Sequence, residues 1–166
     1  MPLTRIHDNA VKAWTLAASL YGLSWFIPTI IYLIAVTNLK AETGEAIFQN
    51  NNWWLFGGIF LITFLFYVAT VFFFPRIRWR RWRYEVSEKE IDLLRGIIIK
   101  KRTLVPINRV QHVDTIQGPI DKRYKISSVA ISTAATTHEI PALDDETADD
   151  LRNKISSLVQ KVKEDV

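Results

Sequence analysis

Two long uncharged stretches dominate the first half of the chain. Residues 13–39 and 46–75 contain 27 and 30 residues, respectively, without a formal charge. A helix of about 20 apolar residues crosses a bilayer core about 30 Å thick, whereas helices buried in soluble proteins rarely stay uncharged for so long. We therefore predict two transmembrane helices, at about residues 13–36 and 53–74, rather than a pair of buried core helices.

The flanks of these stretches favour membrane helices over a cleaved signal peptide. Trp side chains prefer the headgroup level of a membrane. Five of the six tryptophans lie near the expected interfaces: Trp14, Trp53, Trp54, Trp79 and Trp82. The apolar region of a signal peptide is only about 7–15 residues long, and residues 35–37 (Ala-Val-Thr) do not form a clear cleavage site. Pro28 is expected to kink the first helix, because proline lacks an amide donor and clashes with the preceding turn.

A cluster of arginines follows the second apolar stretch. Its members are Arg76, Arg78, Arg80, Arg81 and Arg83. Basic residues next to membrane spans stay in the cytoplasm, and the loop between the spans carries one basic residue, Lys40. The sequence therefore predicts a multi-pass protein of the cell (cytoplasmic) membrane with both termini cytoplasmic, and arginines that contact lipid headgroups. Nucleic-acid binding and specific headgroup recognition are the alternatives for this cluster.

From Trp82 onward, apolar and polar residues alternate, which is typical of half-buried strands. Gly, Pro and polar residues separate the alternating segments. Six short strands are expected, at residues 82–86, from 91 to a tight reversal at 95–96, 97–105, 110–117, 127–133 and 139–143. Short, closely spaced strands favour an antiparallel β sandwich or open barrel over a parallel sheet.

The last twenty residues have the pattern of an amphipathic helix. Asp144 or Asp145 can cap its start. One apolar stripe recurs at helical spacing: Ala148, Leu151, Ile155, Leu158 and Val162. We expect this stripe to pack against the sheets. The predicted fold class is thus a membrane α-helical hairpin followed by an α+β domain like a pleckstrin-homology (PH) domain.

Composition and charge separate the two halves of the chain. All six Trp and nine Phe lie in residues 1–83, and there is no cysteine, which excludes disulfides, thiolate metal sites and cysteine nucleophiles. Residues 84–166 hold 13 basic and 14 acidic side chains, so the net charge of +4 comes from the arginine cluster. Because the second half lacks a basic excess, we expect no nucleic-acid partner.

Several short segments resemble a known family. They are Val105–Asp114 (VPINRVQHVD), Gln117–Pro119 (QGP), Val129–Ala134 (VAISTA) and Glu139–Asp144 (EIPALD). This series is similar to the second type of bacterial PH domain, as found in YdbS-like membrane proteins. The resemblance covers roughly residues 82–158. It implies a membrane-anchored PH-like domain, often accompanied by a second, larger membrane protein with several such domains. Such pairs are associated with resistance to membrane-active antimicrobial peptides.

The sequence offers little for catalysis or metal binding. His112 with Asp114, and His138 with Glu139, are the only neighbouring histidine–carboxylate pairs of the second half, and two ligands do not make a metal site. There is no nucleophile elbow, phosphate-binding glycine loop or paired-carboxylate arrangement. Neither span carries a charge that could relay ions. We expect no enzyme activity, cofactor or metal; an enzyme or a small oligomeric transporter is the weakest alternative.

Basic residues of the second half define a candidate ligand-binding patch. Lys101, Arg102 and Arg109 are its core, and the Lys-Arg-Tyr-Lys segment at 122–125 can extend it. Its alternative is an ordinary solvated surface balanced by acidic residues. The sequence predicts an N-terminal segment with the hairpin (1–83) and a cytoplasmic PH-like domain (84–166). This module is expected to bind or scaffold a partner membrane protein, or a second copy of the chain, with anionic-lipid sensing as the alternative function.

Overall fold

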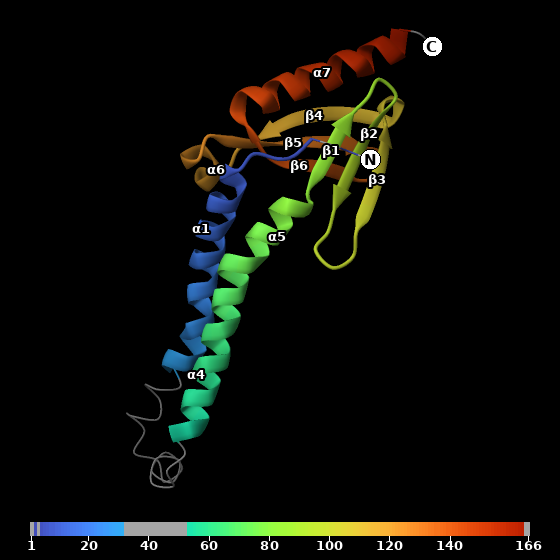
Figure 1. Cartoon of the computed structure of the whole chain (residues 1–166). Coiled ribbons are helices and arrows are strands. Elements are labelled where there is room, and N and C mark those ends of the chain that lie inside the picture. The colour runs from blue at the N-terminus through green and yellow to red at the C-terminus, as the bar shows by residue number, and fades with distance from the viewer. Residues whose placement is uncertain (1, 3, 32–52, 165–166) are drawn as a thin grey trace. The chain divides into compact units, whose positions relative to one another are not determined.

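The computed structural model describes residue 2 and residues 4–31 and 53–164 (Figure 1). Its contacts divide the chain into two compact units, one of Met1–Trp14 with Pro75–Val166 and the other of Thr15–Phe74. The end of the first predicted span and the loop after it lie outside the described residues.

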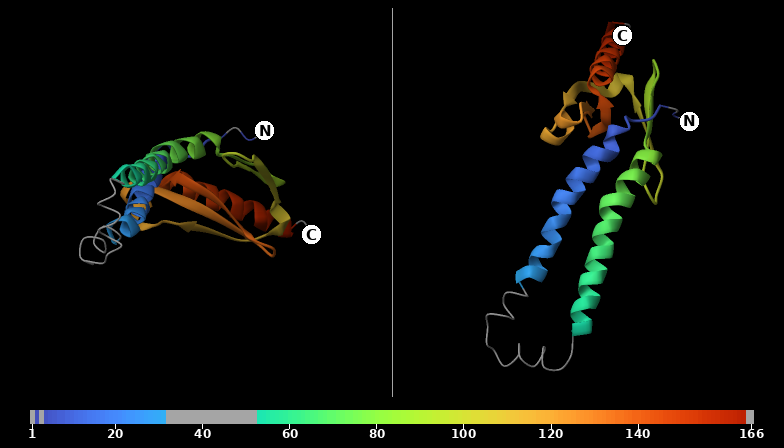
Figure 2. Two further views of the ribbon diagram at one scale, coloured as in Figure 1. Left: turned by 90° about the horizontal axis from the view of Figure 1, so that it is seen from below. Right: turned by 60° about the vertical axis from the view of Figure 1, so that its left-hand side comes forward.

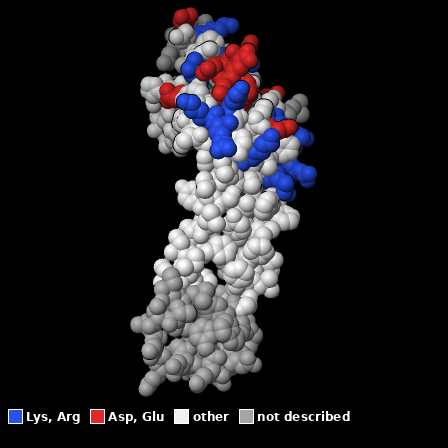
Figure 3. Space-filling view, turned by 90° about the vertical axis from the view of Figure 1, so that its left-hand side faces the viewer, with Lys and Arg blue, Asp and Glu red and all other residues white. Residues whose placement is uncertain are grey.

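The first apolar stretch forms α1 (Asn9–Leu23), which continues through the 3₁₀ turn η1 (Ser24–Phe26). The second forms α4 (Trp53–Val68), a π-helical turn η2 (Ala69–Phe73) and α5 (Phe74–Arg81). Two continuous helical segments, Asn9–Ile31 and Gly57–Arg81, are long and apolar enough to cross a membrane, and only 6% of an 18-residue apolar window in each is buried. Many large hydrophobic side chains are exposed on these helices, and Figure 3 shows a long surface without charged residues (white). Such a surface suits lipid, whereas core helices of a soluble protein would be covered.

Within the unit Thr15–Phe74, α1 and α4 run side by side in Figures 1 and 2. Phe26 packs against Tyr67 with ring centroids 5.7 Å apart. Gly22 leaves room for the Tyr67 ring, since an added β-carbon would lie 2.6 Å from it. The 3₁₀ turn η1 ends just before Pro28, and the Ile27 amide donates to the Ser24 carbonyl that Pro28 cannot reach. Pro28 was expected to kink the helix, and the described residues show a locally tightened turn just before it.

The other unit is built from two three-stranded antiparallel sheets and a C-terminal helix. The first sheet has the order β1 (Arg83–Val86), β2 (Glu90–Arg95) and β3 (Lys101–Pro106). The second has the order β4 (Val110–Ile116), β5 (Ile126–Thr133) and β6 (Thr137–Asp144). The 3₁₀ turn η3 (Ile107–Arg109) joins the sheets, the short helix α6 (Pro119–Arg123) joins β4 to β5, and α7 (Asp145–Glu164) follows β6. The predicted fold class is confirmed.

One hydrophobic core joins both sheets to α7, which lies along β4 and β5 (Figures 1 and 2). Ile91, Val129 and Ile155 are fully buried in it, and they come from the first sheet, the second sheet and α7. The predicted apolar stripe of the terminal helix does face the core, and Val159 adds to it. Burial of this stripe is what fixes α7 on the sheets, because an isolated helix of this length is marginal in water.

The strand predicted at residues 97–105 begins four residues later in the structure. β3 starts at Lys101, and residues 96–100 form a loop in which Ile98 and Ile99 are 89% and 81% exposed. Three consecutive β-branched residues predict a strand by propensity, but burial of the Ile91↔Val105 pair determines the register. That register ends at the pair Arg95↔Lys101, which leaves the isoleucines in the connection.

The chain up to Trp14, together with the residues from Pro75 onward, belongs to the sheet unit, which differs from the boundary expected at residue 83. The Tyr84 amide donates to the Thr4 carbonyl at 3.0 Å, and the His7 amide to the Ala142 carbonyl at 2.8 Å. Ile6 and Ala10 are 2% and 0% exposed within the core. The N-terminal segment, residues 4–14, thus packs as part of the PH-like domain.

Candidate anion-binding site

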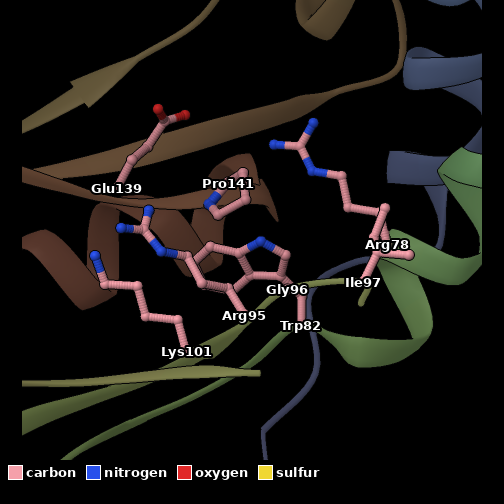
Figure 4. A pocket seen from close by; sticks show the side chains of 8 residues that line it. All are labelled: Arg78, Trp82, Arg95, Gly96, Ile97, Lys101, Glu139 and Pro141. Atoms are coloured by element: carbon pink, nitrogen blue, oxygen red, sulfur yellow. The ribbon is translucent and has the colours of Figure 1, made fainter. Parts of the chain in front are cut away.

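A cavity of about 460 Å³ lies at the end of the first sheet, next to β6 (Figure 4). We call it the basic pocket, and its lining residues are Arg78, Trp82, Arg95, Gly96, Ile97, Lys101, Glu139 and Pro141. Three cations, from α5, β2 and β3, therefore line the pocket together with one carboxylate from β6. Trp82, 5% exposed, and the buried Pro141 supply apolar wall between the charges.

The hairpin register places two of these cations together. Arg95 and Lys101 are directly opposite each other at the last pair of β2 and β3, and they share a face with the buried Leu93. Like charges opposite each other on a sheet repel. The described residues form two ion pairs, Arg102–Asp92 and Arg152–Asp149, and neither involves a cation of the basic pocket. The pocket thus concentrates positive charge that an acidic ligand would neutralise.

Two side chains near the basic pocket, His138 and Trp14, interact with its positive charges. Burial, and secondarily the positive charges of Arg95 and Lys101, hold the pKa of His138 below its ordinary value. On the other side of the pocket, the Arg78 guanidinium lies 4.2 Å from the centroid of the Trp14 ring. That contact holds the long Arg78 side chain at the pocket edge without neutralising its positive charge.

A second cavity, of about 400 Å³, lies on the other side of the β2–β3 loop. We call it the arginine pocket, and it is lined by Pro2, Arg80, Arg81, Arg83, Leu94, Arg95, Gly96 and Lys100. None of these lining residues is acidic. Burial, and secondarily the charge of Arg5, lower the pKa of Arg83. Arg95 and Gly96 line both pockets, so the β2–β3 loop separates two basic surfaces.

The five arginines of the predicted headgroup cluster are divided between these pockets. Arg78 lines the basic pocket, and Arg80, Arg81 and Arg83 line the arginine pocket. Arg76 is exposed on α5 and lines neither. Contact of this cluster with lipid headgroups stays a prediction.

The structure does not bring Lys101, Arg102 and Arg109 together. Lys101 faces the basic pocket, whereas Arg102, as the next residue of the strand, faces the opposite side of the sheet. There the Arg102 Nη2 donates to Asp92 Oδ2 at 2.7 Å, and this bond with the Asp92 charge raises the pKa of Arg102. Asp92 is only 7% exposed, so Arg102 serves mainly to neutralise a buried carboxylate.

Arg109 lies in η3 and lines a broad third cavity of about 940 Å³ with His112 and His138. Lys122, Arg123 and Lys125, on α6 and just after it, line none of the three cavities. Sequence reasoning missed Arg95, Lys100 and Glu139 as pocket residues. Alternation along the strand could have placed Arg95 and Lys101 on one face, but only with the correct register of the hairpin.

Comparison with known proteins decides the family. The family model described as bacterial PH domain matches residues 18–159, which include the second apolar helix, Gly57–Arg81, and the first one from residue 18 onward. The chain belongs to the bacterial PH domain family. The resemblance seen in the sequence is thereby confirmed.

Two relatives of this bacterial PH domain protein are membrane proteins of Bacillus subtilis (strain 168). This chain is 39% identical to UPF0699 transmembrane protein YdbS over 165 residues. The aligned region covers 99% of this chain and 98% of YdbS. This chain is 28% identical to UPF0699 transmembrane protein YdbT over 67 residues. That aligned region covers 40% of this chain and 14% of YdbT. No solved structure matches the chain.

These findings make this bacterial PH domain protein a membrane protein of the UPF0699 family. The family is one of PH-domain transmembrane proteins and is not a known enzyme family. Within the described part of the chain, no three His, Cys, Asp or Glu side chains come close enough to hold a metal ion, and the His112–Asp114 pair gains no third ligand.

Proposed function

We propose that this protein is a membrane-anchored binding module whose PH-like domain holds an acidic group in the basic pocket. In this proposal the hairpin of residues 1–83 anchors the chain with both termini in the cytoplasm. The domain of residues 84–166, completed by the N-terminal segment, then faces the cytoplasmic surface of the membrane. The arginines after the second span support this orientation, because basic residues next to short loops are retained in the cytoplasm.

The observation that carries this proposal is the convergence of Arg78, Arg95 and Lys101 beside the Trp82 ring. A cavity of about 460 Å³ falls within the roughly 300–1,000 Å³ range of small-ligand sites. Guanidinium groups match the geometry of phosphate oxygens and can donate two parallel hydrogen bonds to them. Phosphate of an anionic lipid is the acidic group that a tethered domain meets at the membrane surface, so we assign the pocket to an anionic headgroup.

Charge reversal in the pocket tests this function. Each basic residue near a membrane surface contributes on the order of 1 kcal/mol, so Arg95→Glu with Lys101→Glu should weaken headgroup binding about tenfold or more. The full chain, purified in neutral detergent, would be titrated with short-chain phosphatidylglycerol, and bound lipid counted by native mass spectrometry. Phosphatidylcholine serves as the uncharged reference lipid.

A matched variant controls for net charge. Lys122→Glu with Arg123→Glu changes the total charge equally but lies outside the basic pocket. It should leave the affinity for phosphatidylglycerol nearly unchanged. Equal weakening by both double variants would show that the lipid responds only to the overall charge, and the assignment of the pocket would then be wrong.

Assembly with a second membrane protein is the other candidate function. It is favoured by the similarity of 67 residues of this chain to part of YdbT, a second transmembrane protein of the organism that holds YdbS. A domain of the same architecture in a larger membrane protein would offer this PH-like domain a surface to bind. We propose that such a pair acts as a scaffold at the membrane, in support of envelope defence against membrane-active peptides.

Crosslinking of intact spheroplasts tests both the partner and the orientation. A membrane-permeant, lysine-reactive crosslinker should join the tagged chain to a membrane protein that bears related PH domains, as identified by mass spectrometry. An impermeant reagent of the same length should not do so. Recovery of free monomer alone would count against assembly, and equal capture by the impermeant reagent would reverse the proposed orientation.

A further inference from the structure

The loop between β2 and β3 exposes apolar side chains on a domain that lies outside the spans. Ile98 and Ile99 are 89% and 81% exposed, more than any other large hydrophobic side chain in the described residues, including those on the apolar helices. Ile97, by contrast, is half-buried and lines the basic pocket. Clustered exposed apolar side chains next to polar rims mark contacts with a partner or a membrane.

The backbone of this loop has a defined shape. Gly96 has a φ of +117°, and a β-carbon there would lie 1.9 Å from the Ile99 carbonyl oxygen. The chain therefore folds back closely on itself directly after the last strand pair, Arg95↔Lys101. This close return is compatible with glycine alone, and it directs Ile98 and Ile99 outward from the hairpin.

Charge identifies what the isoleucines face. The basic pocket and the arginine pocket lie on either side of the loop, and they bring Arg80, Arg81, Arg83, Arg95, Lys100 and Lys101 next to it. An apolar tip between cations complements a surface that is anionic outside and apolar inside, which describes the interface of a bilayer with acidic lipids. Arg81 also ends α5 only seven residues after Phe74, a helical length of about 10 Å, so the chain itself keeps these cations near the end of the second span.

We propose that the β2–β3 loop inserts Ile98 and Ile99 into the interface of the anionic membrane, with the flanking cations on the lipid phosphates. This gives the PH-like domain an attachment to the bilayer that is separate from the two spans. It goes beyond the proposed headgroup site, because insertion of the loop does not require the basic pocket to be occupied. A domain held at two points presents one fixed face to the cytoplasm, where a partner would meet it.

A single-cysteine probe measures the depth of the loop. The chain has no cysteine, so Ile98→Cys labelled with an environment-sensitive nitrobenzoxadiazole dye reports one position only. In the full chain reconstituted in phosphatidylcholine–phosphatidylglycerol vesicles, we expect a blue-shifted emission that lipids carrying a shallow doxyl group quench. Glu88→Cys is the matched control, because it is exposed in the turn at the opposite end of β2, about 20 Å away along six residues.

Changes of lipid and salt complete the test. The blue shift and the quenching should decrease in pure phosphatidylcholine and at about 1 M salt, where the Debye length falls to about 3 Å. Emission like that of the Glu88→Cys control in anionic vesicles would overturn the proposal. A blue shift that persists in detergent and resists doxyl quenching would identify a protein contact, with a partner or a second copy, and would overturn it equally.

The double variant Ile98→Ser with Ile99→Ser separates this proposal from the headgroup site. Both side chains are exposed, so the domain should fold as before. With the dye moved to Lys100→Cys, the variant should lose the blue shift that the same probe shows beside the native isoleucines. Its binding of short-chain phosphatidylglycerol should stay within about twofold of the unchanged chain. Unchanged lipid binding in the Arg95→Glu with Lys101→Glu variant, beside the expected blue shift of the loop probe in the native chain, would refute only the headgroup site.

Discussion

Replacing Ile6 with alanine should destabilise the PH-like domain by about 2–5 kcal/mol, the usual cost of deleting a large aliphatic side chain from a core. Ile6 is 2% exposed and lies in the same cluster as residues of both sheets and α7. The Trp79 Nε1 donates to the Ile6 carbonyl at 3.3 Å, so the backbone there is also held. Pulse proteolysis of the full chain across a urea series, in mild detergent, measures the unfolding free energy of the domain.

A second isoleucine provides the control for this experiment. Ile116 is 54% exposed at the end of β4, and Ile116→Ala should change the unfolding free energy by less than about 0.5 kcal/mol. Equal urea midpoints for the two variants would mean that the N-terminal segment does not belong to the core. The expected difference would instead show that the N-terminal segment completes the domain that follows the second span.

Replacing Gly96 with alanine should cost about 1–3 kcal/mol, because a positive φ and a steric clash coincide at this position. The added β-carbon would lie 1.9 Å from the Ile99 carbonyl oxygen at a φ of +117°. The backbone from Gly96 to Lys100 must then move, which displaces the loop between the two basic pockets. Both the urea midpoint and the binding of short-chain phosphatidylglycerol should therefore decrease, although no charge has been changed.

Gly118→Ala is the matched control for the loop. Gly118 has a φ of −78°, which any residue adopts, and a β-carbon there would lie 3.1 Å from the flexible Asp121 carboxylate. Its replacement should cost less than about 1 kcal/mol and leave lipid binding unchanged. If Gly96→Ala keeps both the stability and the lipid affinity of the unchanged chain, the shape of the loop does not position the pocket cations.

The strands and the terminal helix were predictable because their patterns are local. Tyr84 and Val86 alternate with polar neighbours, and Ala148 and Ile155 recur at helical spacing. Burial of one face is sufficient to select each element. The start of β3 was not predictable from propensity, because Ile97–Ile99 favour a strand intrinsically and only the pairing with β2 excludes them.

The candidate site was only half predictable for a similar reason. Lys101 was identified as a basic residue of interest, but its partners Arg95 and Arg78 come from the neighbouring strand and from α5. Arg102 has the same charge and is adjacent in sequence, yet it pairs with the buried Asp92 on the other face. Which cations converge depends on strand register and on side-chain direction, and neither can be read from a charge count.

The sequence by itself determined the apolar hairpin, the change to strands with alternating apolar and polar residues, the cluster of arginines after the second span, and the family. These features are local, because length, periodicity and charge act on neighbouring residues. Only the tertiary structure decided that residues 4–14 pack into the PH-like domain, that the cations divide between two pockets, and that Ile98 and Ile99 lie exposed between them. Those features join segments far apart in the chain, and the packing of one shared core, not the preference of any single segment, brings them together.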